Sequence, residues 1–189
     1  SAMGLNDHGA AAAIAEWFAT RGDEYRAEYL NALIALSKGE FADARKILVR
    51  VAKQAPPSWA VVRSLLATYA SPNEQREALN LLGDLRSKFP DNPSILVGQA
   101  EILTRNGEYD DAMQVYDESL RMQATIPALE GAIRSAFLAD RPNTALSIVR
   151  EMEQRFVESP RFLLNKAQTL EAHGDIDQAV LTYERLLML

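Results

Sequence analysis

The hydrophobic positions of residues 106–120 follow the spacing of one amphipathic helix that begins directly after a helix end. They fall at positions i, i+3, i+4, i+7 and i+11, and so lie on one side of a helix with about 3.6 residues per turn. Gly107 stands just before them, where a preceding helix needs a left-handed residue in order to end. The apolar residues of this pattern are Tyr109, Ala112, Met113, Tyr116 and Leu120.

The small residue at the centre of this pattern recurs along almost the whole chain, at steps of 33 or 34 residues. These residues, which we name the anchor alanines, are Ala44, Ala78, Ala112, Ala145 and Ala179. Four residues after each comes a large apolar residue: Leu48, Leu82, Tyr116, Val149 and Tyr183. Twelve residues before each comes another apolar residue: Ala32, Leu66, Ala100, Ile133 and Ala167.

Residue types that end helices keep the same register, five residues before each anchor alanine: Gly39, Asn73, Gly107, Asp140 and Gly174. Chance repetition in an alanine-rich chain would not keep the alanines, the large apolar residues and the helix ends in step. A fixed period in the range of about 20–50 residues is the signature of a solenoid.

The repeated alanine predicts pairs of antiparallel helices, because two helices approach to about 8–10 Å only where the contacting residues are small. First helices are expected at 24–37, 58–70, 93–105, 126–139 and 160–172. Second helices are expected at 41–54, 75–88, 109–122, 143–156 and 176–188. Proline-containing turns separate one pair from the next.

These residues resemble the tetratricopeptide repeat (TPR) family over about residues 25–189. The resemblance rests on the period and on the G-x-Y-x-x-A-x-x-x-Y pattern of Gly107, Tyr109, Ala112 and Tyr116. It also rests on prolines that close repeats, such as Pro56 and Pro90. The resemblance implies an all-α, right-handed superhelical α-solenoid that binds a protein partner and carries out no chemistry.

The repeat pattern departs from the family at two places. Repeat two has Asn73 and Gln75 where glycine and an aromatic residue are usual. Repeat four has Asp140 and Pro142 there and is one residue short, so the register of its first helix is open by one residue.

The sequence predicts one domain. Residues 1–7 are expected to be a tag remnant or disordered, and residues 8–189 to form the solenoid. Its parts are a half repeat at 9–22 and repeats at about 25–57, 58–92, 93–125, 126–159 and 160–189. An ordinary alanine-rich capping helix remains the alternative to the half repeat. The apolar end, residues 186–189, predicts either a longer native protein, which we favour, or self-association through the C-terminal helix.

Composition and charge narrow the function classes. The chain has 189 residues and a net charge of −6, which argues against non-specific nucleic-acid binding. It has no cysteine, hence no disulfide and no thiolate metal site. No apolar run approaches the roughly 20 residues of a membrane span, so direct membrane insertion is not expected. The compartment stays open between the cytoplasm and a bacterial periplasm.

The sequence contains no recognisable catalytic motif. Its two histidines, His8 and His173, are isolated, and acid pairs such as Asp110 and Asp111 are explained by the first turn of a helix. We therefore predict a non-enzyme with no cofactor and no metal.

In a TPR-like array the first helices line a concave groove, and residues 18, 15 and 11 positions before each anchor alanine should face it. Five arginines in or beside this set predict an extended protein or peptide partner that carries acids, because the guanidinium group suits carboxylates. The alternative is that they are ordinary solvated arginines, partly neutralised by glutamates. The predicted groove residues are Arg26, Tyr29, Leu33, Arg63, Ser94, Val97, Glu101, Arg105, Glu130, Arg134, Arg161, Leu164 and Gln168.

Two functions fit these features. The first is a non-catalytic protein–protein interaction module or scaffold that binds a partner segment in its groove. The alternative is a segment of a longer periplasmic TPR scaffold in a bacterial envelope or exopolysaccharide synthesis and secretion system. Some proteins of the family clamp a partner's C-terminal carboxylate with lysine and asparagine. That clamp is not expected here, because the corresponding positions hold Tyr29, Leu33, Ser64 and Ser94.

Overall fold

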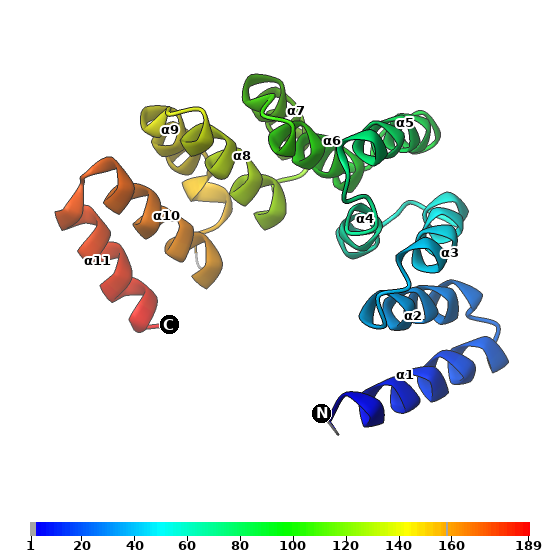
Figure 1. Ribbon diagram of the computed structural model, residues 1–189. Helices are drawn as coiled ribbons and strands as arrows, with labels where there is room; N and C mark the ends of the chain where they lie inside the picture. Colours follow the sequence, from blue (N-terminus) through cyan, green and yellow to red (C-terminus); the bar gives the residue numbers. More distant parts are fainter. Residues whose placement is uncertain (1–2, 158) are drawn as a thin grey trace. The chain divides into compact units, whose positions relative to one another are not determined.

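The computed structural model describes residues 3–157 and 159–189, and the regular secondary structure of this part of the chain is helical throughout (Figure 1). The α-helices are α1 (Met3–Thr20), α2 (Glu24–Ser37), α3 (Phe41–Gln54), α4 (Trp59–Leu66), α5 (Pro72–Lys88), α6 (Pro93–Arg105), α7 (Tyr109–Met122), α8 (Ile126–Leu138), α9 (Pro142–Met152), α10 (Pro160–His173) and α11 (Ile176–Leu187). A 3-10 turn, η1 (Glu153–Arg155), extends α9. The predicted all-α fold is confirmed.

Within the repeats the helix bounds follow the predicted ones closely, except around α4 and α5 and at the end of α9, which stops at Met152 rather than at residue 156. Helix α4 ends at Leu66 rather than at residue 70, and α5 begins at Pro72 rather than at residue 75. Ser71 and Glu74 form a capping box, in which each side chain bonds the other residue's backbone N–H. This cap starts α5 early, so the predicted helix end at Asn73 is wrong: Asn73 lies in the first turn of α5.

The other predicted helix ends are sharp because their residues adopt the left-handed conformation. Gly107 has a φ of 83°, which glycine adopts without the steric cost that a Cβ atom brings. Asp140 takes the same role in repeat four with a φ of 58°. Aspartate is one of the few other residues that tolerate this conformation, so the second helix of repeat four still begins in register.

The anchor alanines lie in the core. All five are at most 2% exposed, and so are four of the five residues that stand twelve positions before them. A buried small residue on each helix of a pair lets the two backbones approach closely, as predicted from the repeat. The large apolar residue one turn after the anchor fills the space beside it, as Leu48, Leu82 and Tyr116 do at 0% exposure.

The chain divides into two compact units, Ser1–Gly98 and Gln99–Leu189, with the division inside α6. In the N-terminal unit α1 packs on α2, α2 on α3, and α3 on α4. In the C-terminal unit α7 packs on α8, α8 on α9, α9 on α10, and α10 on α11. Helices α8 and α10, the first helices of successive repeats, are also in contact.

Helix α1 begins at Met3 and packs on α2 (Figure 1). The structure therefore starts this helix before residue 9, where the predicted half repeat begins. The expected tag remnant at 1–7 includes residues 1–2, which lie outside the described part of the chain. Whether α1 is a half repeat or a capping helix stays a prediction.

Candidate partner-binding site

Seven of the predicted groove residues lie on the first helices of the C-terminal unit. We name this set the first-helix surface: Glu101, Arg105, Glu130, Arg134, Arg161, Leu164 and Gln168. They come from α6, α8 and α10. One ion pair joins α6 to α8 and a second joins α8 to α10, so the charged residues of this set form a row across the three helices.

The first link in this row joins α6 to α8 at Glu101. The Nη2 atom of Arg134 donates to Oε2 of Glu101. The Nε atom of Arg105, one turn along α6, lies 3.4 Å from Oε1 of the same carboxylate. One half-buried glutamate therefore holds two of the predicted groove arginines.

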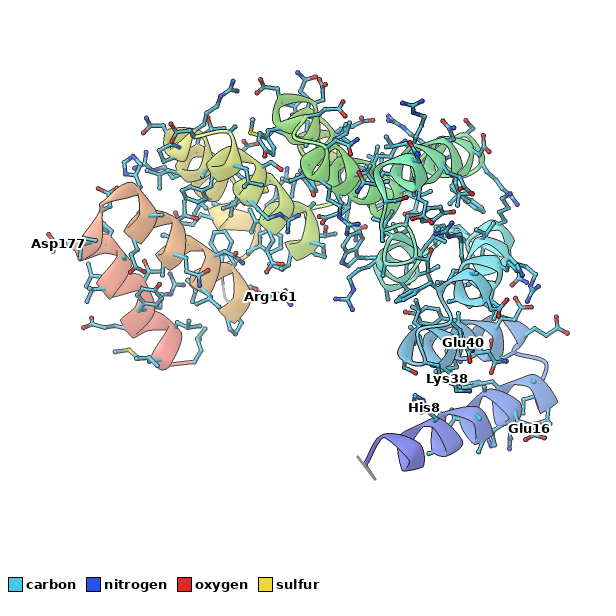
Figure 2. The ribbon with its side chains drawn as sticks, in the orientation of Figure 1. His8, Glu16, Lys38, Glu40, Arg161 and Asp177 are labelled. Atoms are coloured by element: carbon cyan, nitrogen blue, oxygen red, sulfur yellow. The ribbon has the colours of Figure 1, made fainter. Side chains whose placement is uncertain are left out.

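The second link joins α8 to α10 at Glu130. Arg161 binds this carboxylate with two parallel bonds, Nε to Oε1 at 2.6 Å and Nη2 to Oε2 at 3.0 Å. The Nδ2 atom of Asn165 donates to Oε1 at 3.2 Å. These bonds from Arg161 raise its pKa above the usual value, so the guanidinium stays charged. Arg161 stands near the start of α10 (Figure 2), and the side chains of Leu164 and Gln168 are exposed further along that helix.

Glu101 also accepts a hydrogen bond from Tyr116, a buried residue of the second helix α7. The hydroxyl of Tyr116 donates to Oε2 of Glu101 at 3.2 Å, while the residue is 0% exposed. Burial, and then the negative charge of Glu101, raises the pKa of Tyr116 well above its usual value. The hydroxyl therefore stays protonated and remains a donor.

Tyr116 reaches Glu101 because Gly131 of α8 leaves room for its ring. A Cβ atom at Gly131 would lie 2.2 Å from Cζ of Tyr116. Gly98 is also closely packed, but mainly against a first helix: a Cβ atom there would lie 2.6 Å from Cγ1 of Val62 on α4 and 3.4 Å from Leu82, the counterpart of Tyr116. Both glycines stand fourteen residues before an anchor alanine. Sequence reasoning missed this position, although a helical glycine at a fixed place in two repeats was its signal.

The predicted groove residues of the N-terminal unit are less connected. Arg26 is exposed and pairs with Asp23, Nη1 to Oδ2 at 3.1 Å. The hydroxyl of Tyr29 lies 3.4 Å from Oγ of Ser64, which links α2 to α4. Arg63 is exposed, and within the described residues it forms no ion pair or hydrogen bond through its side chain.

Leu33 and Ser94 are both partly exposed, Leu33 on α2 and Ser94 at the start of α6. The backbone N–H of Ser94 donates to Oδ1 of Asn92 at 2.9 Å. Val97 differs from the prediction, since it is only 3% exposed. It is one of four consecutive buried residues, 95–98, so α6 is enclosed on all sides there. We therefore leave Val97 out of any binding surface.

The charges of the first-helix surface are paired with one another. Three arginines on the first-helix surface face two glutamates, and each of the three already pairs with one of them. The glutamates therefore neutralise part of the charge of these arginines, as the alternative predicted. Among the residues that the structure describes, no group of three or more His, Cys, Asp or Glu side chains is placed to hold a metal ion. Within the same residues, no helix combines the length and the apolar character needed to cross a membrane.

Comparisons with known proteins agree on the fold. A sequence model described as "Tetratricopeptide repeat" matches residues 1–58 and 73–127, which is more than half of the chain. The comparison with curated proteins gave no match.

Solved structures with a similar fold include a thermophilic TPR protein from Thermus thermophilus, with a TM-score of 0.67 and 17% identity over 89% of this chain and 93% of that one. A tetratricopeptide repeat protein from Parabacteroides merdae has a TM-score of 0.60 and 13% identity over 97% and 80% of the two chains. Yeast Tom70 has a TM-score of 0.69 and 18% identity over 89% of this chain, but only 37% of its own. At these identities the likeness concerns the fold alone.

Proposed function

Because the chain belongs to the tetratricopeptide repeat family, we propose that it binds a segment of a partner protein on its first-helix surface. The fold supports a protein–protein interaction scaffold in general, and TPR repeat proteins are generally non-catalytic. Beyond this general function, we propose which surface binds the partner and which chemical groups the partner carries.

The observation that carries the proposal is the linked row of Glu101, Arg134, Glu130 and Arg161 across three first helices. Tyr116 and the row's own bonds hold these side chains in one arrangement before any partner arrives. Side chains that are already ordered lose less conformational entropy on binding, about 0.5–1.5 kcal/mol less for each long side chain. A fixed row of alternating charges therefore favours binding with a defined register.

The partner proposed for this row is an extended segment that carries at least one carboxylate. Arg161 uses one edge of its guanidinium on Glu130, which leaves the Nη1 side available for a second acceptor. With three arginines and two glutamates, the first-helix surface has one positive charge in a protein of net charge −6. Leu164 and Gln168 lie beyond Arg161 on α10 and offer one apolar and one amide contact.

Reversing two charges of the row is expected to weaken partner binding. The experiment is affinity capture from a lysate of the source cells, followed by measurement of Kd for each captured protein after purification. For Arg134→Glu/Arg161→Glu we expect Kd to rise by about tenfold or more, equivalent to about 1.4 kcal/mol, because a partner carboxylate then meets two acids. The loss should be larger at low salt than at moderate salt.

The matched control is Lys46→Glu/Arg76→Glu, which changes the net charge by the same amount on the second helices α3 and α5. It should leave Kd unchanged. Equal weakening by both pairs would mean that net charge alone matters. Unchanged binding by Arg134→Glu/Arg161→Glu would move the interface away from the first helices.

We further propose self-association through α11, which exposes several large apolar side chains beside polar ones such as Gln178 and Glu184. Ile176, Val180 and Leu181 are each about half exposed, and Leu187 is 86% exposed. Exposed apolar side chains of this kind are common in association surfaces. Light scattering should give the mass of a dimer for this chain, and Leu187→Lys should give a monomer, whereas Glu184→Lys on the same helix should not. A monomeric wild-type chain at high concentration would contradict the proposal.

A further inference from the structure

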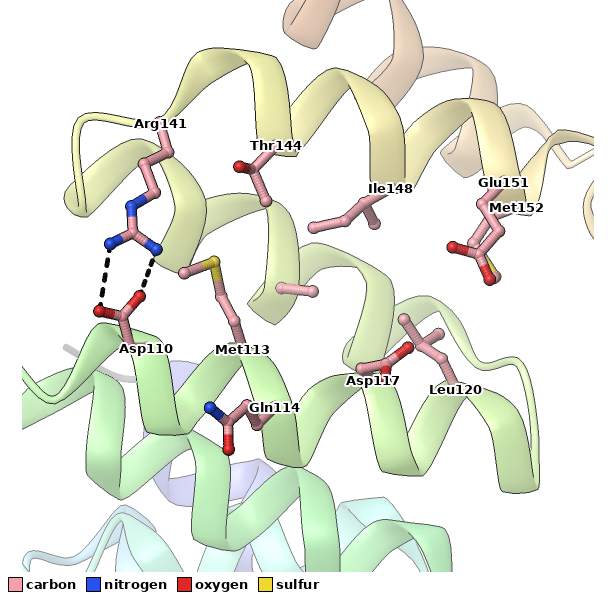
Figure 3. A pocket seen from close by; sticks show the side chains of 11 residues that line it. Asp110, Met113, Gln114, Asp117, Leu120, Arg141, Thr144, Ile148, Glu151 and Met152 are labelled. Carbon is pink, nitrogen blue, oxygen red and sulfur yellow. Dashed lines mark hydrogen bonds and ion pairs between the residues drawn. The ribbon is translucent and has the colours of Figure 1, made fainter.

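A groove with no assigned role lies between the second helices α7 and α9 (Figure 3). Its volume is about 580 Å³. The volume falls within the range of about 300–1,000 Å³ that is usual for ligand sites. We name it the α7/α9 groove. It lies within the C-terminal unit and uses different helices from the first-helix surface, apart from Ala132 of α8 in its floor.

Four large apolar side chains line the floor of the α7/α9 groove, with the polar Gln114 and Thr144 beside them. Met113 and Leu120 line it from α7, and Ile148 and Met152 line it from α9. Leu120 and Met152 are buried, whereas Met113 and Ile148 are partly exposed and form the accessible part of the floor. Apolar side chains that enter the groove would be removed from water, which favours binding by about 25 cal/mol for each Å² of apolar area buried.

The two ends of the α7/α9 groove differ in charge. At one end Arg141 binds both carboxylate oxygens of Asp110, and this pair bridges the two helices (Figure 3). At the other end stand two acids, Asp117 on α7 and Glu151 on α9. Asp117 is paired with the exposed Arg121, Nη2 to Oδ2 at 2.6 Å. Within the described residues Glu151 has no basic partner, so this end carries an uncompensated negative charge.

The corresponding place in the N-terminal unit, between α3 and α5, is occupied by a fixed ion pair. Arg45 stands one residue after its anchor alanine, as Met113 does, and Glu74 stands four before the next anchor, as Arg141 does. Arg45 donates to Oε1 of Glu74 at 2.6 Å and lies 4.1 Å from the ring centre of Tyr69. The hydrogen bond from Arg45, together with those from Ser71, lowers the pKa of Glu74 to about 2, so the pair stays charged.

The cavity beside this ion pair is smaller, about 330 Å³, and Ala67, Thr68 and Ala70 at the end of α4 line it together with residues of α3 and α5. Stacking of repeats therefore does not by itself leave a large apolar groove between second helices. The α7/α9 groove depends on particular residues, above all on a methionine where repeat one has an arginine that bonds across the gap. Methionine is flexible and polarisable, and it suits surfaces that adapt to a ligand.

We propose that the α7/α9 groove binds a short segment of a partner protein that carries two apolar side chains with a lysine or arginine beside them. The apolar side chains enter beside Met113 and Ile148. The basic group lies between Asp117 and Glu151, where it supplies the cation that Glu151 lacks. Because the bridging Arg141–Asp110 pair closes the other end, the segment binds in one direction. This proposal does not rest on the first-helix surface, and either one can fail without the other.

Selection of a displayed library of random 12-residue peptides on the whole chain tests the proposal. Selected peptides are expected to share a pair of apolar residues with a nearby Lys or Arg. The chain has five methionines, so labelling their methyl groups with ¹³C gives a simple NMR spectrum. A selected peptide should shift the methyl signals of Met113 and Met152 and leave that of Met188, which follows α11, unchanged.

Two variants separate the apolar and the charged contributions. Ile148→Glu places a charge on the floor and should abolish peptide binding. Glu151→Lys changes an exposed residue and should raise Kd by about tenfold while the fold is kept, since it removes the unpaired acid. The control Glu184→Lys makes the same change of charge on α11 and should leave Kd unchanged.

Three results would overturn the proposal. One is selection of peptides without a basic residue that bind Glu151→Lys as well as the wild type. Another is peptide binding that shifts neither Met113 nor Met152. The third is a shift of both signals with protein concentration alone, which would make a second copy of this chain the occupant of the groove.

Discussion

Replacing Tyr116 by alanine is expected to lower the free energy of unfolding by about 3–5 kcal/mol, the usual cost of truncating a buried aromatic side chain. Tyr116 is 0% exposed and fills the space beside Ala112 and Gly131. Alanine would leave a cavity there and remove the donor that holds Glu101. Urea unfolding followed by circular dichroism measures the change. A loss of about 0.5 kcal/mol or less, which is the usual scale of a surface substitution, would contradict this account of the packing.

Tyr116→Phe separates the ring from the hydroxyl. We expect it to cost about 0.5–1.5 kcal/mol, the usual contribution of one hydrogen bond. The same variant should change the dependence of stability on alkaline pH. The pKa of Tyr116 is raised in the folded chain, so its contribution is complete below the unfolded pKa of about 10 and is lost as pH rises toward the folded value. Tyr116→Phe should therefore lose less stability above pH 10 than the wild type. An identical alkaline loss in both proteins would mean that Tyr116 does not titrate as described.

Gly131→Ala is expected to lower the free energy of unfolding by about 1–3 kcal/mol, because the new methyl group overpacks a filled site. Its Cβ atom would lie 2.2 Å from Cζ of the fully buried Tyr116. This sign is opposite to the ordinary effect of the substitution within a helix. Alanine is otherwise favoured over glycine there by about 0.5–1 kcal/mol.

Gly83→Ala is the matched control. Gly83 also lies inside a helix, α5, but a Cβ atom there would meet nothing within 4 Å. We expect this variant to be more stable than the wild type by about 0.5–1 kcal/mol. In a Tyr116→Ala background the cost of Gly131→Ala should vanish, since the clashing ring is gone. Additive effects in that double-mutant cycle would show that the two residues do not touch.

The fold was predictable because its signals are local and repeated. Spacing along 106–120 identifies one amphipathic helix without knowledge of any other part of the chain, and the anchor alanines place five such helices in register. The left-handed Gly107 was predictable for the same reason, since the end of a helix depends on its own residues. The helix end predicted at Asn73 is wrong because the capping box of Ser71 and Glu74 begins α5 earlier than the repeat period places it.

The candidate site was only partly predictable, because its contacts join residues about one repeat apart. The number of residues between each position and its anchor alanine correctly predicted that consecutive first helices carry Glu101, Arg134, Glu130 and Arg161. It did not predict which arginine would bind which glutamate, since that depends on side-chain reach and on competing partners. It also wrongly treated Val97 as exposed, because a position in the repeat does not report how completely neighbouring helices enclose it.

The sequence by itself determined the all-α class, the helix pairs, the register of their small residues and the family, because each depends on a spacing that the chain repeats. Only the tertiary structure decided that Tyr116 passes Gly131 to reach Glu101, and that a groove lies between α7 and α9. Both depend on the volumes of side chains that meet across helices. A single substitution, such as methionine at the place of arginine, alters such a volume without altering the period.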